Sequence, residues 1–191
     1  MKEETESFYP SNRTQWRAWL QENHDRKQSV WLIFDKMKTG IRALSWSEAV
    51  DEALCYGWID SKSQSIDKEK YRQFFCQRKP NSVWSKINKE KILKLIEEGK
   101  MTKAGLASIE LAKQNGSWTL LDEVEELTIP EDLEAAFNTQ PDAKDFFLGL
   151  SKSVKKMMLH WITFAKQPAT RQKRISEIVT LAAEKKKPKQ F

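Results

Sequence analysis

The spacing of hydrophobic positions changes along the chain from helical to strand-like and back to helical. A first helix is predicted from Ser11 or Asn12 onward, with tryptophans at helical spacing on one face. The apolar run Val30–Phe34 has the length and aromatic content of a strand that is buried on both faces, and Thr39–Gly40 closes it. The chain therefore opens with a helix followed by a strand.

The next helix has a clear start and a clear end. Residues 45–48, Ser-Trp-Ser-Glu, fit a capping box, in which the serine oxygen and the glutamate side chain each satisfy a free backbone donor. Gly57 is typical of the left-handed residue that ends a helix. Glu48, Asp51 and Glu52 lie on this helix, and because Glu48 already has a capping role we expect the three carboxylates to form a solvated face.

Two polar and aromatic segments then predict an antiparallel hairpin. Residues 58–66 and 71–78 have strand-like composition, a polar turn separates them, and residues 79–81, Lys-Pro-Asn, end the second strand. Side chains alternate across a strand, so every second residue of the second strand shares one face. These residues are Arg72, Phe74, Cys76 and Arg78.

The remainder of the chain has helical spacing. Ser85 and Thr102 are N-cap candidates for two helices that end at Gly99 and Gly116 and form a helical hairpin. The fold class predicted is α+β, a small antiparallel sheet with helices followed by a C-terminal helical module. Its expected parts are an α+β domain at residues 1–116, an acidic joint at 117–129, and a helical module with a basic tail at 130–191.

Composition and charge narrow the class of protein. Of the 191 residues, 39% are hydrophobic and 31% charged, which is typical of a chain that folds in water. The acidic first six residues lead into no apolar stretch, so we expect no signal peptide, no membrane insertion and a cytoplasmic location. A net charge of +6 favours anionic partners. Cys55 and Cys76 are interpreted as reduced thiols.

The usual catalytic patterns are absent from the sequence. There is no phosphate-binding Gly-rich loop, no Gly-x-Ser-x-Gly elbow and no His-Glu-x-x-His pair, and the only histidines are His24 and His160. We therefore expect no catalytic residue, no metal and no cofactor. An enzyme of unknown reaction type is kept as an alternative, with Asp60 as base and Cys55 as nucleophile.

Several stretches together resemble one known family. Residues 52–60 (EALCYGWID), 78–88 (RKPNSVWSKIN) and 99–105 (GKMTKAG) are similar to signature stretches of the YdeI/OmpD-associated, or bacteriocin-protection, family. Residues 146–187 resemble the domain that gives this family its name. The resemblance implies a role in tolerance of bacteriocins, antimicrobial peptides or envelope stress, without a settled reaction or cofactor.

The candidate site is the end of the sheet, where aromatic and basic residues gather. Arginines can bind carboxylate or phosphate with two hydrogen bonds, tryptophans offer stacking faces, and a helix start favours an anion. The residues predicted to line one shallow pocket are Trp58, Asp60, Arg72, Arg78, Trp84, Ser85 and Asn88. The expected function is non-catalytic binding of a small anionic or aromatic ligand, or of a protein partner.

Two alternatives to this pocket remain open at the level of sequence. In the first, Trp58 and Trp84 belong to the core and Asp60 pairs internally with Arg72 or Arg78. In the second, aromatic side chains beside Arg and Lys on a small sheet bind single-stranded nucleic acid, RNA in particular, although no RNA-binding motif is present.

The last helix begins with an unfavourable arrangement of charge. Arg171, Lys173 and Arg174 follow Pro168 closely, where cations oppose the helix dipole. An anion should therefore offset them. The acidic stretch Asp122–Glu126 is the internal candidate, and an external phosphate or nucleic acid is the alternative.

Overall fold

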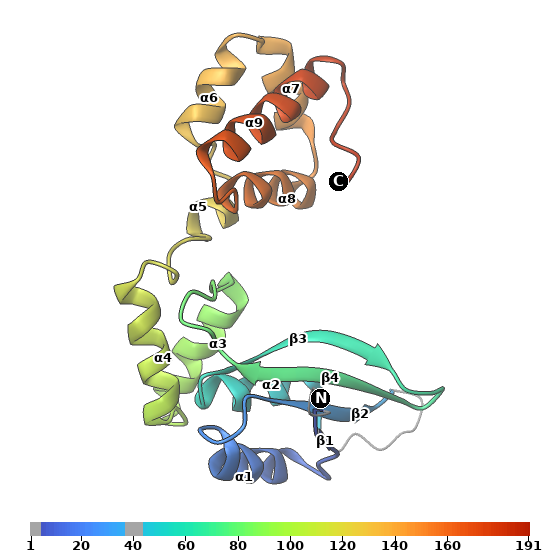
Figure 1. The fold of residues 1–191 in the computed structure, drawn as a ribbon, viewed down its shortest axis with the longest axis vertical. Coiled ribbons are helices and arrows are strands. Elements are labelled where there is room, and N and C mark those ends of the chain that lie inside the picture. The colour runs from blue at the N-terminus through green and yellow to red at the C-terminus, as the bar shows by residue number, and fades with distance from the viewer. Residues whose placement is uncertain (1–4, 37–43) are drawn as a thin grey trace. The chain divides into compact units, whose positions relative to one another are not determined.

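The computed structural model describes residues 5–36 and 44–191, so the strand end expected at Thr39–Gly40 lies outside the described residues. Two compact units, residues 1–119 and 120–191, make up the chain (Figure 1). The elements of the described part, in order, are β1 (Ser7–Phe8), α1 (Arg13–Asn23), β2 (Ser29–Asp35), α2 (Trp46–Cys55), β3 (Trp58–Ser65), β4 (Lys70–Gln77), α3 (Lys86–Glu97), α4 (Lys103–Gln114), α5 (Asp122–Glu125), α6 (Glu131–Asn138), α7 (Pro141–Gly149), α8 (Lys152–Thr163) and α9 (Pro168–Ala183). The α+β class predicted from the sequence is confirmed.

The sheet of the first unit has the strand order β1-β2-β4-β3. The predicted hairpin of β3 and β4 is antiparallel, and β2 pairs antiparallel with the other side of β4. The two-residue strand β1 pairs parallel with β2, so the sheet is mixed rather than purely antiparallel. The register of β3 shifts by one residue between Asp60 and Ser63, which places Ser61 and Lys62 together opposite Phe74 in a bulge.

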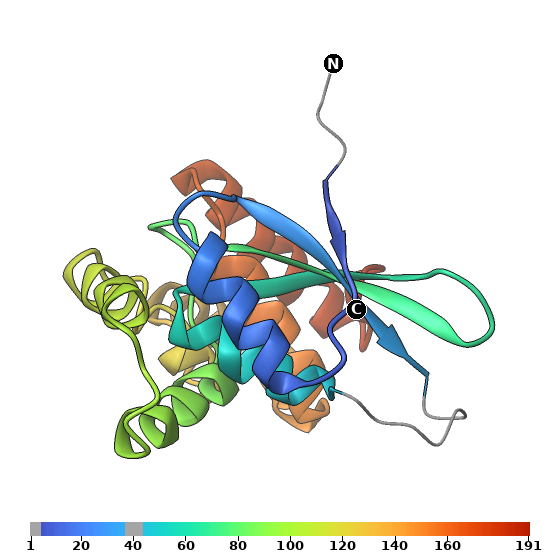
Figure 2. The same cartoon turned by 90° about the horizontal axis from the view of Figure 1, so that it is seen from below.

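Burial alternates along β2, so the prediction that this strand is buried on both faces was wrong. Val30, Leu32 and Phe34 are buried, whereas Trp31 and Ile33 are only half-buried. The reason is that α1 and α2 pack on one face of the sheet alone (Figure 2). Helices that cover one face leave the side chains of the other face in contact with solvent.

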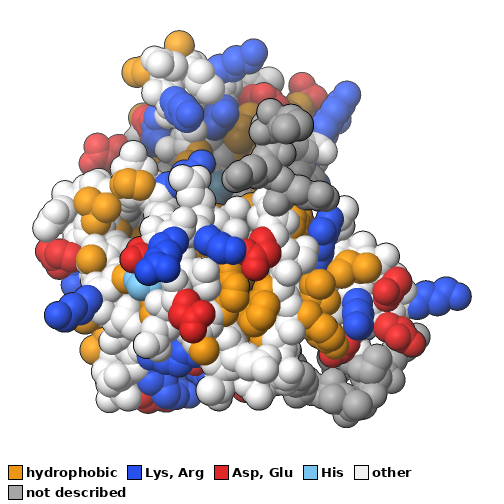
Figure 3. All heavy atoms as spheres, turned by 60° about the horizontal axis from the view of Figure 1, so that its bottom comes forward, with side chains coloured by type: hydrophobic (Ala, Val, Ile, Leu, Met, Phe, Trp, Pro, Cys, Tyr) orange, Lys and Arg blue, Asp and Glu red, His pale blue; other side chains and the backbone are white. Residues whose placement is uncertain are grey.

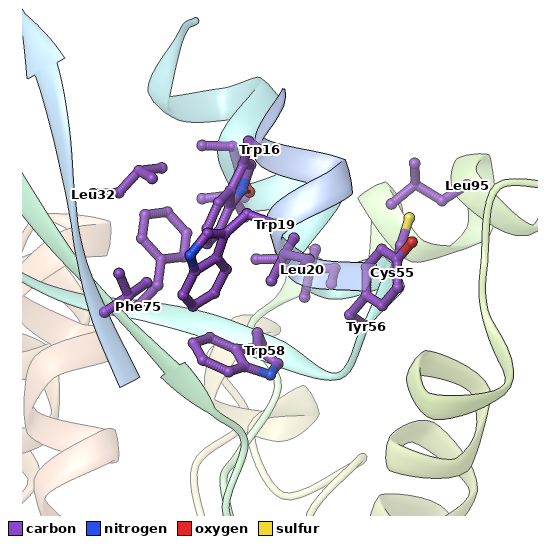
Figure 4. Packing of buried hydrophobic residues seen from close by; sticks show 14 of the residues in the cluster. Trp16, Trp19, Leu20, Leu32, Cys55, Tyr56, Trp58, Phe75 and Leu95 are labelled. Atoms are coloured by element: carbon purple, nitrogen blue, oxygen red, sulfur yellow. Dashed lines mark hydrogen bonds between the residues drawn. The ribbon is translucent and has the colours of Figure 1, made fainter. Parts of the chain in front are cut away.

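Aromatic residues form the core between these helices and the sheet. Trp16 of α1 is fully buried, its indole nitrogen donates to the carbonyl of Ala49 at 3.0 Å, and its ring lies edge-on to Phe75 with centroids 5.4 Å apart. Trp19 and Trp58 lie in the same cluster (Figure 4). This packing fixes which face of β4 points inward.

The ends of α2 follow the sequence prediction. Ser45 and Glu48 form the capping box, and Gly57 has a φ of +73° just after the helix. The helix α4 approaches this end very closely. A Cβ atom placed on Gly105 would lie 2.3 Å from the carbonyl oxygen of Cys55, and the hydroxyl of Thr102 donates to that same oxygen at 2.6 Å.

Glu52 is buried, with 3% of its side chain exposed, so the expected solvated face of carboxylates was wrong at this position. Its two oxygens accept hydrogen bonds from Arg13 Nε at 2.5 Å and from Arg17 Nη1 at 2.6 Å. The two arginines stand one helical turn apart on α1, so both can reach a single carboxylate on α2. The glutamate therefore joins the two helices.

The second unit is entirely helical in its described structure. Its core is made of apolar residues from α5 to α9, principally Leu133, Phe137, Phe147, Met158, Leu159, Ile162, Ile175 and Ile178. None of the helices in residues 5–36 and 44–191 combines the length and the apolar character that crossing a bilayer requires.

The cations at the start of α9 have an internal partner, but not the expected one. Arg171 donates from Nε and Nη2 to the two carboxylate oxygens of Asp132, at 2.6 and 2.8 Å. This guanidinium holds the pKa of Asp132 below its usual value. In the stretch Asp122–Glu126, Glu125 instead pairs with Lys156 of α8. A bidentate pair at the first turn of α6 therefore offsets the cation.

Candidate functional site

Trp58 and Trp84 lie in the core of the first unit. Trp58 is fully buried, and its indole nitrogen donates to the carbonyl of His24 at 3.1 Å. Trp84 is 1% exposed and lies beside Trp118, with ring centroids 5.1 Å apart. Neither ring offers an open face of the kind that a stacking ligand needs, which agrees with the core alternative left open by the sequence.

Asp60 is bound by neutral donors rather than by an arginine. The indole nitrogen of Trp46 and the amide of Gln73 each donate to its Oδ2 at 2.9 Å. Ser85 is the N-cap of α3 and accepts the backbone N–H of Asn88. Ser85 and Asn88 therefore form a helix start.

Arg72 and Arg78 lie too far apart to share a small pocket. They are six residues apart along β4 and its extension, which corresponds to about 20 Å. Strand alternation nevertheless brings both to the outward face of the sheet, together with Phe74 and Cys76. The two arginines therefore belong to an extended face and not to the compact pocket that the sequence predicted.

The middle of this face carries two aromatic rings with two cations. Trp31 and Phe74 are directly opposite each other on β2 and β4, with ring centroids 5.0 Å apart and planes at 74°. The Cζ atom of Arg72 lies 4.4 Å from the centre of the Trp31 ring, and the Nζ atom of Lys62 lies 5.4 Å from Trp31 and 5.3 Å from Phe74. We call these four residues the aromatic platform.

The cations of the aromatic platform have no carboxylate partner in residues 5–36 and 44–191. Arg72 donates from Nε and Nη2 to the amide oxygen of Gln64, at 3.0 and 2.8 Å, which positions its guanidinium over the sheet. Lys62 comes into reach of Phe74 because the bulge in β3 places an extra residue there. Both charges therefore remain free to meet an anion.

Arg78, at the end of the same face, is a largely buried cation. Its Cζ atom lies 3.5 Å from the centre of the Trp84 ring, and Nη1 donates to the carbonyl of Val83 at 3.2 Å. Its Nε is buried and has no hydrogen-bond partner among the described residues. Burial lowers the pKa of Arg78 to about 10. The charge of Asp60 opposes this lowering, but no carboxylate of the described residues forms an ion pair with Arg78, so this arginine is a candidate for binding an anion.

We expect Arg78→Met to leave the free energy of unfolding unchanged to within about 1 kcal/mol, or to raise it. Burying a cation without a paired carboxylate destabilises the folded state, because the charge loses its hydration. An apolar side chain of similar length removes that cost. The control is Arg17→Met, which breaks an ion pair with buried Glu52 and should lower the free energy of unfolding by more than about 1 kcal/mol. Urea denaturation compares the two, and equal losses would show that Arg78 is structural.

The sequence did not identify Trp31 or Lys62 as site residues. Trp31 stood in a run that was interpreted as buried on both faces, although its position between Val30 and Leu32 placed it opposite to them in a strand with one covered face. Nothing in the sequence indicated the bulge that positions Lys62. The arginines are recognisable from the sequence because residue type alone marks them as anion ligands.

Cys55, the nucleophile of the enzyme alternative, is fully buried on α2. Burial raises the pKa of its thiol, which disfavours the reactive thiolate. In the described ranges, no three His, Cys, Asp or Glu side chains come together in an arrangement that could hold a metal ion.

Positive charge is concentrated in the unit that carries the aromatic platform. Residues 1–119 contain 21 Lys and Arg against 16 Asp and Glu, whereas residues 120–191 contain 12 against 11. On the face shown in Figure 3, basic, acidic and hydrophobic side chains lie side by side. The excess of cations in the first unit favours an anionic partner for it.

Two family models match the chain, one in each unit. Residues 8–108 match a family described as a domain of unknown function (DUF8412), and residues 126–185 match the family described as Bacteriocin-protection, YdeI or OmpD-Associated. No curated protein and no solved structure matches. The YdeI/OmpD-associated resemblance is confirmed at residues 126–185, whereas the earlier stretches that resembled this family fall in the other match. The chain therefore belongs to the DUF8412 family, whose model matches more than half of its length, and it also contains a YdeI/OmpD-associated domain.

Proposed function

We propose that the outward sheet face of residues 5–119 binds single-stranded nucleic acid, with bases stacking at the aromatic platform and phosphates contacting Arg72, Lys62 and Arg78. The observation that carries the proposal is the pair Trp31 and Phe74, two half-buried rings on a sheet face, with cations above them that form no ion pair in the described part of the chain. Aromatic rings beside basic side chains are the common elements of sheet surfaces that bind single strands.

The spacing of the charges favours an extended polyanion over a small ligand. Arg72 and Arg78 stand about 20 Å apart on one face, and the rings lie close to Arg72. A small anion can meet only one of these arginines at a time. A single strand of about four or more nucleotides can contact both, while its bases stack in between.

Stacking would be tolerant of base identity, because each base presents a π-face to an aromatic ring. Few side chains of the platform offer the paired donors and acceptors that read base edges. The proposed activity is therefore binding with weak sequence preference and with a marked dependence on salt, since phosphate contacts release counterions.

We expect Trp31→Ala and Phe74→Ala each to weaken binding of a fluorescein-labelled oligouridylate by about 5- to 150-fold, which corresponds to about 1 to 3 kcal/mol per stacked base. Fluorescence anisotropy at fixed salt measures the affinity. Trp46→Ala is the control, because Trp46 is 48% exposed but belongs to α2 on the covered side of the sheet. Equal affinity of all three variants would contradict the proposed site.

The charges are tested by the salt dependence of the same titration. If Lys62 and Arg72 each contact one phosphate, the double variant Lys62→Gln/Arg72→Gln should reduce the slope of log affinity against log salt by about 1.4. An unchanged slope would mean that these cations only cover the rings beneath them. If the protein binds neither single-stranded RNA nor single-stranded DNA, the proposal is contradicted.

The description of the second family adds a role to be proposed for the whole chain. It names bacteriocin protection, and we carry this over as tolerance of such peptides by a cytoplasmic protein that acts without catalysis. The readout is survival of a deletion strain supplied with the wild-type chain or with Trp31→Ala. Full protection by the variant would separate this role from the aromatic platform.

A further inference from the structure

The second unit contains a groove that has no part in the proposed nucleic-acid site. It lies between the end of α7, the start of α8 and the end of α9, and has a volume of about 850 Å³. Its floor is apolar and consists of the half-buried side chains Phe146, Leu150, Val154 and Leu181. This volume falls within the range of about 300 to 1,000 Å³ that small-molecule sites occupy.

One wall of the groove is strongly cationic. The segment that follows α9 contributes Lys185, Lys187 and Lys189, and none of these three forms an ion pair within the described residues. Lys186 is paired with Glu184, and Glu177 is the one carboxylate of the lining. An apolar floor beside unpaired lysines complements a ligand that is apolar along its length and anionic at one end.

The lysines are held beside the groove by a defined turn. Lys185 has a φ of +56°, and the N–H of Lys186 donates to the carbonyl of Leu181 at 2.8 Å, which reverses the chain at the end of α9. Further along, Pro188 is buried, and Phe191 packs edge-on against Trp161 with ring centroids 5.6 Å apart. Apolar residues thus anchor the segment, and the lysine side chains remain available.

We infer that this groove binds a single-chain anionic amphiphile of the fatty-acid class. The acyl chain lies on the apolar floor, and the carboxylate meets the lysine wall. Two features favour this ligand over an acidic helix of a partner protein. The lysines line one side only, and the groove has the volume of a small-molecule site, whereas a stable protein interface needs a broad surface that buries roughly 1,200 Å² or more.

The test is a calorimetric titration of the full chain with laurate below its micelle-forming concentration. Gly149→Leu is the blocking variant, because Gly149 lines the groove and a Cβ at this position meets no atom within 4 Å, so a longer side chain has room to occupy the groove. We expect it to weaken laurate binding by at least about tenfold, with an unchanged melting temperature. Shortening the ligand to decanoate should cost about tenfold, since each buried methylene contributes to affinity.

The charge of the wall is tested by Lys187→Gln/Lys189→Gln, which should weaken laurate by about tenfold. The matched control is Lys166→Gln/Lys173→Gln, which removes the same charge from exposed positions outside the groove and should leave the affinity unchanged. No binding of laurate, or binding that neither Gly149→Leu nor the wall variant alters, would overturn the inference. So would binding confined to an acidic helical peptide or to anionic vesicles.

Discussion

Gly105→Ala is expected to lower the free energy of unfolding of the first unit by about 3 kcal/mol, although it adds a single methyl group. The new Cβ would lie 2.3 Å from the carbonyl oxygen and 2.7 Å from the carbonyl carbon of Cys55, and both are backbone atoms at the end of α2. Helix α4 must then move away, and the hydrogen bond from Thr102 to the same oxygen is lost. Overpacking against rigid atoms typically costs about 1 to 3 kcal/mol or more.

Tryptophan fluorescence during urea denaturation measures this loss selectively, because seven of the eight tryptophans lie in residues 1–119. The control is Gly149→Ala at the end of α7, where a Cβ meets no atom within 4 Å. That change should leave stability unaltered or raise it by up to about 1 kcal/mol, because alanine restricts the unfolded chain. If both variants unfold at the same urea concentration as the wild type, Gly105 does not approach the end of α2 closely enough to exclude a methyl group.

Glu52→Gln is expected to cost about 3 kcal/mol. The change keeps the volume of the side chain but removes the charge that two arginines of α1 share inside the protein. Loss of one partner of a buried ion pair typically costs about 3 to 5 kcal/mol, and the lower figure applies because Arg13 and Arg17 keep a third of their side chains exposed to water.

The matched control for Glu52→Gln is Asp51→Asn, one residue earlier on α2. Asp51 pairs with Lys91 at 2.5 Å, but its side chain is 22% exposed, so its loss should cost less than about 1 kcal/mol. Denaturant midpoints of the two variants compare the pairs directly. Similar values for both would show that burial adds nothing to the Glu52 bridge.

Features that depend on a few neighbouring residues were predictable. The capping box at Ser45 and Glu48, the left-handed Gly57 and the hairpin of β3 and β4 each depend on residues close in sequence, and each is present. Alternation likewise placed Arg72 and Phe74 together on the face of β4 opposite to the buried Gln73 and Phe75. Local backbone geometry determines such features, so they can be predicted without knowledge of the tertiary contacts.

Features that depend on distant partners could not be derived from the pattern. The burial of Glu52 requires α1 to lie across α2, and the choice of Asp132 over the acidic stretch Asp122–Glu126 depends on how α6 meets α9. The predicted pocket did not account for the length of extended chain between Arg72 in β4 and Arg78 just after this strand. The half-burial of Trp31 depends on helices covering one side of the sheet alone.

The bulge in β3 also bears on how the protein behaves at high concentration. Strand β3 forms one edge of the sheet, and an edge strand with free backbone groups can pair with an identical strand of another molecule. The extra residue at Ser61 and Lys62 interrupts the regular spacing of those groups, and exposed polar side chains from Ser61 to Ser65 surround it. The irregularity that brings a cation over Phe74 therefore also protects the sheet against edge-to-edge aggregation.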